Sequence, residues 1–526
     1  MKIFSPFNNA CYLWFCVTGL SISTISAQDL QWVKVLGDSG NAEHTAALVA
    51  DDNGNVYSTG YYIGPSDLDP GPGYHYLYSS SYGKGTFVSK LDANGNFIWA
   101  KGFASGNVDE GSNGAGIGLD DNKNVYITGT FGGTVDFNPG PIAFNITANN
   151  SFDPIGVDPY VVKLDSNGNF LWAKSFSGPR IDFASDIEVT GNGYCYITGN
   201  FRDSVDFDPG PGTSFLYNPT SPLVQSTYIV KLDPSGNLVW VKNIPTSVPK
   251  QIALDSLENV YAVGYFLDTV DFDPGPLVHN IIPASNFAGF VWELDSAGNF
   301  VKSLCFDVTA GAVRIEDIAF DHKNDIYLCG YYSDTIDADP GPGIYNLSDG
   351  TGAWTGAEIF VCKLKNNGDF EWAGSMGGIY NDEGTVIALD ENGRVYVSGY
   401  FDETVDFDMG PGSYPLTTLY GWEMYILNLD TAGNFLTVKH LPGTSLERAY
   451  DLFIKDDFIY LGGSIVEFVD FGFGHTLRAM ARAKGLWLNI RHLLQQILRK
   501  PKTVPYAQFT LTPLTITSLF PYFNKS

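Results

Sequence analysis

The sequence predicts an all-β protein: a seven-bladed β-propeller of four-stranded antiparallel blades, with the seventh blade incomplete or atypical. An x-Tyr-x-x-Gly pattern recurs seven times, with its glycines 69, 70, 65, 66, 69 and 64 residues apart. Each complete copy contains four short β-branched and aromatic runs bounded by turn residues. Radial repetition of such units builds a propeller. The glycines are Gly60, Gly129, Gly199, Gly264, Gly330, Gly399 and Gly463.

The clearest copy of the repeat predicts its four strands in order. They are expected at 186–189, 194–201, 227–233 and 238–242. Short D-x-x-G-N segments join the first strand to the second and the third to the fourth. Glycine supplies the positive φ that such a hairpin needs, so these segments indicate turns rather than metal-binding loops. Examples are Asp51 to Asn55, Asp92 to Asn96, Asp165 to Asn169 and Asp430 to Asn434.

Closure of the ring is predicted from the first strand-like residues of the chain, just after an expected signal peptide at 1–27. Residues 31–34, QWVK, match the fourth strand of a repeat, as in IWAK at 98–101. A lone fourth strand there can complete the last blade and remove a bare sheet edge. The tryptophan of this strand is expected to pack between blades rather than to form a sugar-stacking ladder, because its position in the blade is fixed. These tryptophans are Trp32, Trp99, Trp172, Trp240 and Trp372.

The combined motifs resemble a known repeat. D-x-x-G-N-V-Y-x-T-G, then D-F-D-P-G-P-G, then Y-V-x-K-L-D-x-x-G-N-F-x-W-A-K is similar to the SBBP β-propeller repeat over roughly residues 30–474. The resemblance implies an exported propeller of the kind found in Bacteroidetes-type bacteria and implies no particular activity. Such proteins are often exported by type IX secretion through a carboxy-terminal sorting domain, and the sequence shows no such domain.

The amino terminus indicates export. Residues 1–27 combine one Lys, a short apolar stretch and small polar residues, which is typical of a signal peptide, and leave a propeller at 28–474. The expected location is therefore secreted or on the outer cell surface. Four cysteines remain after cleavage and are expected to be small buried hydrophobic residues, with a Cys329–Cys362 bridge as the alternative. They are Cys195, Cys305, Cys329 and Cys362.

Composition excludes some partners. The 526 residues carry a formal net charge of −28, so repulsion of phosphates argues against nucleic acid. No interior apolar run is long enough for a membrane span once the signal peptide is removed.

The long loops between second and third strands are expected to gather on one face, where an unknown extracellular protein or glycan binds. Each loop opens with an acidic DxDPGP-type element, interpreted first as a rigid turn with solvated acids. Two carboxylates two residues apart share a face in extended chain, so calcium is the alternative cofactor. The weak calcium candidates are Asp67, Asp69, Asp206, Asp208, Asp271, Asp273, Asp337, Asp339, Asp406 and Asp408.

No catalytic residue or cofactor site is predicted. The seven histidines are scattered, and neither a G-x-S-x-G elbow nor a P-loop occurs. A non-catalytic binding or scaffolding module is therefore favoured. A hydrolase acting on extracellular polysaccharide is the alternative, because a carboxylate pair can arise anywhere among 58 acids. A purely structural surface protein is a third hypothesis.

Residues 475–526 differ from the rest of the chain. They contain eight Lys or Arg and no Asp or Glu, and the third strand of the seventh repeat does not follow. A frameshift near 472–475 is favoured. The alternatives are a basic amphipathic helix at 477–499 or an unusual third strand at 510–517.

Overall fold

The computed structural model describes most of the chain between Leu30 and Arg491. The described residues are 30–37, 43–80, 83–105, 111–149, 151, 156–218, 221, 223–284, 287–308, 311–348, 356–419, 421–443, 448–456, 458–465, 468–470, 476–478 and 484–491. They belong to one compact unit, Gln28–His492. The predicted signal peptide at 1–27, and the tail hypotheses as far as they concern residues from 492 onward, lie outside the described residues.

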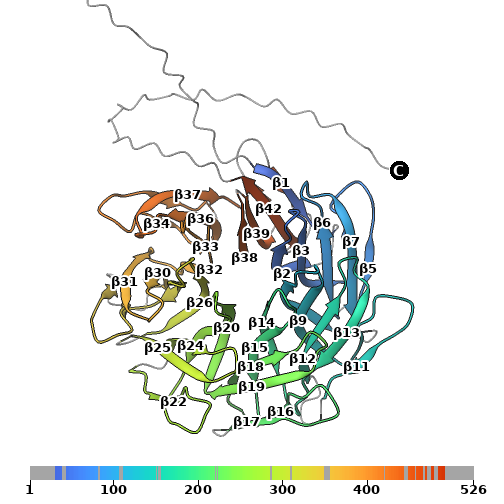
Figure 1. The fold of residues 1–526 in the computed structure, drawn as a ribbon. Helices are drawn as coiled ribbons and strands as arrows, with labels where there is room; N and C mark the ends of the chain where they lie inside the picture. The colour runs from blue at the N-terminus through green and yellow to red at the C-terminus, as the bar shows by residue number, and fades with distance from the viewer. Residues whose placement is uncertain are drawn as a thin grey trace, which may run out of the picture. The chain divides into compact units, whose positions relative to one another are not determined.

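The described elements are all β-strands, and each repeat begins with a strand near the centre of the unit (Figure 1). These inner strands contact one another in chain order, and the last contacts the first, so the sheets surround a central axis. Such radial repetition of antiparallel sheets is a β-propeller. The inner strands are β2 (Glu43–Ala50), β8 (Ser112–Leu119), β14 (Phe183–Val189), β20 (Ser247–Leu254), β26 (Val313–Phe320), β32 (Glu383–Leu389) and β38 (Arg448–Lys455).

Two further strands follow each inner strand outward in its sheet. The second strands are β3 (Val56–Ile63), β9 (Val125–Gly132), β15 (Cys195–Phe201), β21 (Val260–Phe266), β27 (Ile326–Tyr332), β33 (Val395–Phe401) and β39 (Phe458–Ile465). The third strands are β6 (Lys84–Leu91), β12 (Val157–Leu164), β18 (Ser226–Leu232), β24 (Ala288–Leu294), β30 (Glu358–Leu364), β36 (Glu423–Leu429) and β42 (Lys484–Arg491).

The fourth strand of each repeat is the outer strand, and a short hairpin lies in each loop between second and third strands. The outer strands are β7 (Phe97–Ala104), β13 (Phe170–Ser175), β19 (Leu238–Pro245), β25 (Phe300–Val308), β31 (Phe370–Met376), β37 (Phe435–Leu441) and β1 (Leu30–Val35). The hairpins are β4–β5 (Pro65–Asp67, Tyr76–Tyr78), β10–β11 (Thr134–Asp136, Asn145–Thr147), β16–β17 (Ser204–Asp206, Phe215–Tyr217), β22–β23 (Val270–Asp271, Asn280–Ile281), β28–β29 (Thr335–Asp337, Asn346–Ser348), β34–β35 (Thr404–Asp406, Pro415–Thr417) and β40–β41 (Phe468–Asp470, Thr476–Arg478).

The prediction of seven four-stranded blades is wrong. The described residues form six four-stranded blades, and the remaining sheet has six strands in the order β20-β21-β24-β25-β28-β29. The long outer strand β25 causes the difference, because its end reaches the hairpin of the following repeat. Asp307 there pairs with Asp337, and Val308 pairs with Ile336. Blade size is therefore not uniform around the axis.

The last sheet, predicted to be incomplete or atypical, has all four strands, and the strands at 476–478 and 484–491 contradict the alternative of an amphipathic helix over 477–499. Strand β42, which falls within the predicted atypical tail, takes the third position and pairs with β39. Its sequence KGLWLNIR lacks the K-L-D signature of the other third strands, but it has the apolar content that a strand needs. The predicted closure is confirmed, because β1 pairs antiparallel with β42 at the outer edge of this sheet (Figure 1).

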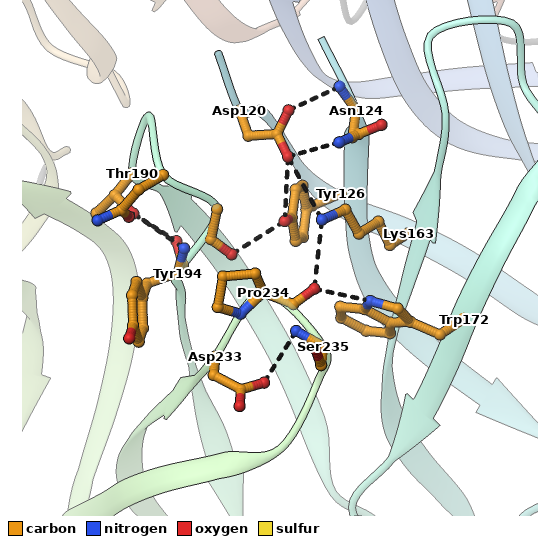
Figure 2. Close-up of polar contacts among 12 residues, drawn as sticks. Asp120, Asn124, Tyr126, Lys163, Trp172, Thr190, Tyr194, Asp233, Pro234 and Ser235 are labelled. Atoms are coloured by element: carbon orange, nitrogen blue, oxygen red, sulfur yellow. Dashed lines mark hydrogen bonds and ion pairs between the residues drawn. The ribbon is translucent and has the colours of Figure 1, made fainter. Parts of the chain in front are cut away.

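Polar contacts between adjacent sheets explain the repeated motif. Figure 2 shows Trp172 and Lys163 pointing to the carbonyl oxygen of Pro234 in the next sheet. Trp172 Nε1 donates at 3.1 Å and Lys163 Nζ at 3.3 Å, and Lys163 also forms a buried ion pair with Asp120 at 3.4 Å. The predicted packing of the outer-strand tryptophans between sheets is thus confirmed. The Tyr, Lys, Asp and Trp of the repeat therefore connect adjacent sheets.

The cysteine prediction is confirmed for the described residues. Cys195, Cys329 and Cys362 are buried, Cys305 is partly buried, and all four are free thiols. The Cys329–Cys362 bridge is wrong for a geometric reason. Cys329 pairs with Val361 in the ladder, so Cys362 is one residue out of register and its side chain points to the opposite face of the sheet.

A thiol reagent should therefore leave Cys195, Cys329 and Cys362 unmodified in the native protein. Burial raises the pKa of Cys195 to about 12, which suppresses the reactive thiolate. Mass spectrometry of peptides after reaction with dithiobis(nitrobenzoate), with and without urea, measures modification at each position. Fast modification of any of the three without urea would contradict this burial.

Candidate binding site

The predicted calcium candidates lie in the hairpin loops, where they bind backbone amides. Asp206 Oδ1 accepts hydrogen bonds from the backbone N–H of Asp208 at 3.1 Å and of Ser214 at 2.7 Å. Asp208 Oδ1 accepts one from Gly210 at 2.8 Å. The same three bonds recur at Asp67 and Asp69, Asp271 and Asp273, Asp337 and Asp339, and Asp406 and Asp408.

These carboxylates therefore shape their own loops. No three His, Cys, Asp or Glu side chains of the described residues are grouped so that they could hold a metal ion. Calcium binding by these loops stays a prediction, and a melting curve with added calcium and with EDTA checks it.

An apolar residue anchors each of these loops. Phe207, between the two acids of its loop, is fully buried against the rings of Phe176, Phe201 and Tyr228, with centroids 4.7–5.7 Å apart. The loop therefore begins as an ordered hairpin. An isolated antiparallel β-bridge pairs Asp206 of this hairpin with Ser177, which follows the outer strand of the preceding sheet. The first part of each long loop thus covers the edge of a neighbouring sheet. Less of the loop is then available as the variable binding surface that the sequence predicts.

A different cluster of side chains lies where the long loops meet the axis. Inner strands begin and second strands end at this end of the sheets, and the cluster is built from both. It comes from four consecutive repeats whose inner strands β20, β26, β32 and β38 contact one another. We call it the axial cluster: Lys250, Arg314, Glu316, Tyr331, Glu383, Tyr400, Trp422 and Arg448.

Arg448 is held by aromatic rings. Its guanidinium lies 4.6 Å from the ring centroids of both Tyr400 and Trp422, and these two rings stack with centroids 4.6 Å apart. One guanidinium nitrogen donates to the Tyr400 hydroxyl at 3.4 Å. Stacking fixes a guanidinium in orientation while most of its N–H groups remain available to an acceptor.

Arg314 is held in the same way. It lies 4.5 Å from the ring centroid of Tyr265 and 5.8 Å from that of Tyr331. Within the described part of the chain, neither Arg314 nor Arg448 forms an ion pair with a carboxylate. The axial cluster therefore holds two guanidinium groups that lie over aromatic rings and form no ion pair with a carboxylate of the described residues, and the charge of Arg448 acts on Glu383.

The two acids of the axial cluster are already engaged. Glu316 forms an ion pair with Lys250 at 2.9 Å. Burial raises the pKa of Glu383, and a hydrogen bond from Tyr400 and the charge of Arg448 oppose that rise. Burial, followed by the negative charges of Glu316 and Glu383, raises the pKa of Tyr331. Three cations and two acids give the cluster a formal charge of +1 in a chain of −28.

The aromatic lining continues across the closure of the ring. His44 stacks on Tyr61 with ring centroids 5.1 Å apart and contacts the ring of Tyr450 at 4.2 Å. Lys84 lies 4.0 Å from the Tyr61 ring centroid. Burial lowers the pKa of His44 to about 4, so its ring is neutral at pH 7. The loop end of the axis is thus lined by aromatic rings and stacked cations.

The axial cluster was not predicted from the sequence, because its charged residues and Trp422 do not recur from repeat to repeat. One signal was present, since the residue after the repeat glycine is an aromatic in several copies. Those copies supply Tyr61, Tyr265, Tyr331 and Tyr400. Their partners, Arg314, Trp422 and Arg448, come from positions that are not repeated, so only the folded ring brings them together.

Comparisons with known proteins give distant similarities. No protein-family model matches the chain. An uncharacterized WD repeat-containing protein of Acanthamoeba polyphaga mimivirus is 23% identical over 374 residues, 58% of this chain. The regulatory protein FlaEY of Caulobacter vibrioides is 32% identical over 77 residues, 15% of this chain. The chain spans only 26% of the length of the first relative and 8% of the second.

Solved structures are similarly distant. The Dos1 propeller aligns with a TM-score of 0.39 and 9% identity, covering 87% of this chain and 95% of that one. A protein of unknown function from Bacteroides caccae aligns with a TM-score of 0.28 and 9% identity, covering 73% of this chain and 93% of that one. The class of this protein, an all-β β-propeller, therefore rests on its own strand pairing.

Proposed function

We propose that this chain is an exported, non-catalytic protein-binding β-propeller whose partner docks on the axial cluster. The observation that carries the proposal is the pair of guanidinium groups, Arg314 and Arg448, which lie over aromatic rings and form no ion pair with a carboxylate among the described residues. Trp, Tyr and Arg are the residues that dominate binding energy at protein interfaces. A protein with surface carboxylates or carbonyls at its docking face fits this composition better than a neutral glycan.

Export is part of the proposal and has separate support. The pattern of residues 1–27 and the resemblance to the SBBP repeat favour a secreted or surface-attached protein. The structure adds one finding on membranes: the described segments include no helix with the length and hydrophobicity of a transmembrane span. Immunodetection of the protein in cell fractions and culture medium tests its location.

Photocrosslinking from the axial cluster tests the docking site. We expect benzoylphenylalanine in place of Trp422 in the full chain to give a discrete adduct with a secreted or surface protein. The same group in place of Tyr217, which is 64% exposed on a hairpin, is the control and should give none. Equal labelling from both positions would show that the adduct reports only surface exposure.

The variant Arg448→Ala should weaken partner binding at least tenfold, or about 1.4 kcal/mol, because it removes a guanidinium that contacts two aromatic rings. Arg448→Lys keeps the charge but loses the planar stack, so it should recover only part of the affinity. Affinity is measured by biolayer interferometry after a thermal melt has verified the fold. Unchanged affinity in both variants would place the partner elsewhere.

A hydrolase is the second candidate, and it rests on the two acids of the axial cluster. Glu383 has a raised pKa, as a general acid requires, and Glu316 lies in the same cluster. Turnover of an extracellular polysaccharide that Glu383→Gln abolishes would favour this candidate over the binding module. Saturable binding without turnover would favour the module.

A further inference from the structure

A second site lies at the opposite end of the axis, where short turns join inner and second strands. A pocket of about 290 Å³ opens where β26, β32 and β38 end. These strands lie next to one another near the centre of Figure 1. We call it the basal pocket, with a floor of Phe320, Leu389 and Ile454 and a rim that includes Asp321, Glu391 and Asp456.

The floor is apolar and firmly held. Phe320, Leu389 and Ile454 lie at or next to the ends of their inner strands, and each packs against a buried core cluster. The ring of Phe320 lies 4.7 Å from that of Tyr261. All three side chains are only partly buried, so they offer aliphatic and aromatic surface to a ligand. A fully polar ligand, such as a hydrated metal ion, would gain nothing from this floor.

Part of the acidic rim is fixed before any ligand arrives. Asp321 Oδ1 accepts hydrogen bonds from the backbone N–H of Lys323 at 2.8 Å and of Asp325 at 3.0 Å. Asp390, which also lines the pocket, accepts two such bonds through Oδ1, both at 2.9 Å. These bonds hold the carboxylates in place. The entropic cost of ordering them when a ligand binds is therefore smaller.

The cation that lines the pocket is already engaged. Lys455 Nζ binds Asp52 at 2.5 Å, and Asp52 also binds Lys123 at 2.6 Å. In contrast, none of Asp321, Glu391 and Asp456 forms an ion pair with a described Lys or Arg. The pocket lining therefore has four carboxyl groups (Asp321, Asp390, Glu391 and Asp456) against Lys455 and His322, so acids outnumber bases around the apolar floor.

We propose that the basal pocket binds an aliphatic ammonium group, with the alkyl stem on the floor and the charged nitrogen at the rim. Alkylammonium chains combine an apolar stem with a compact charge and commonly lie along apolar surface with the charge at its edge. A free diamine and a lysine side chain of a polypeptide share this chemistry. The site is independent of the axial cluster and of the function proposed for it.

Calorimetry on the full chain tests the proposal with 1,5-diaminopentane, with 1,5-pentanediol as the uncharged control of equal length. A third titration with Nα-acetyl-lysine amide distinguishes a free amine from a lysine side chain as the source. All titrations are made at equal ionic strength. We expect saturable binding of at least one amine and none of the diol. Binding of neither amine, or equal binding of the diol, would overturn the proposal.

Paired variants locate the binding. Glu391→Gln and Asp456→Asn together remove two rim charges, and neither carboxylate accepts a backbone hydrogen bond among the described residues, so the fold should be kept. We expect the dissociation constant to rise about tenfold. Glu403→Gln, an exposed acid near the hairpin β34–β35 at the other end of the sheet, is the matched control and should leave it unchanged. Equal affinities in both variants would overturn the assignment to this pocket.

Discussion

Phe207→Ala should lower the free energy of unfolding by about 3–5 kcal/mol, the usual cost of removing a buried phenylalanine ring. Phe207 is fully buried among Phe176, Phe201 and Tyr228, although it belongs to a surface loop by sequence. Its loss leaves a cavity between sheets and releases the hairpin β16–β17 from the outer edge. Urea denaturation followed by tryptophan fluorescence measures the change.

A matched variant lies in the same hairpin. Phe215 is 49% exposed and contacts Tyr217, with ring centroids 6.1 Å apart. Phe215→Ala should change the unfolding free energy by about 0.5 kcal/mol or less, as is usual for exposed positions. If the two variants shift the urea midpoint equally, the hairpin is not anchored through Phe207, and the structural interpretation of the repeated acidic loop fails.

Features that depend on local geometry or on a fixed position in the repeat could be predicted from the sequence. Turns of the D-x-x-G-N type were predictable because their geometry is local. Asp165 Oδ1 accepts the backbone N–H of Asn167 at 2.8 Å and of Asn169 at 2.9 Å, and Gly168 adopts φ of 78°. The tryptophan packing and the closing role of β1 were predictable from their fixed place in the repeat.

Features that depend on distant pairing were not predictable. The six-stranded sheet arises because β25 is long enough to reach β28, which no local pattern signals. Strand β42 was missed because the expected motif is absent, while pairing needs only backbone groups and a suitable apolar pattern. The axial cluster was missed because its members come from different repeats and meet only when the ring closes. Repetition in the sequence marks what holds the ring together, and departures from repetition mark the candidate site.

The stability of the propeller should fall as pH rises from 6.5 to 8.5, because the fold buries carboxyl groups. Burial raises the pKa of Asp182 to about 8, and the nearby carboxyl of Asp158 adds to that rise. Burial also raises the pKa of Asp158, Glu188 and Asp382 to about 7. In the unfolded chain these groups ionise near pH 4.

The direction follows from proton binding. Between pH 4 and 8 the folded protein holds protons that the unfolded chain has lost, so raising the pH favours unfolding across that window. Each carboxyl that titrates near pH 7 should cost about 1 kcal/mol of stability between pH 6 and 8. His44, whose pKa burial lowers to about 4, acts in the opposite direction below about pH 7.5, where the unfolded chain protonates its imidazole. Above about pH 7.5 the buried thiols add to the fall in stability, because burial raises their pKa above that of cysteine in the unfolded chain, so the Asp182→Asn comparison assigns the carboxyl share.

Asp182→Asn tests this origin with little change in shape. Asp182 Oδ1 accepts the backbone N–H of Arg202 at 2.9 Å, which an amide oxygen can also do, and Oδ2 has no hydrogen-bond partner among the described residues. The variant removes one titrating group, so urea midpoints at pH 6.5, 7.5 and 8.5 should depend less on pH than those of the parent. The exposed control Glu403→Gln should keep the parent dependence. A parent whose stability rises with pH above 6.5, or an Asp182→Asn variant with the parent slope, would show that these buried carboxyl groups are not protonated in the folded ring.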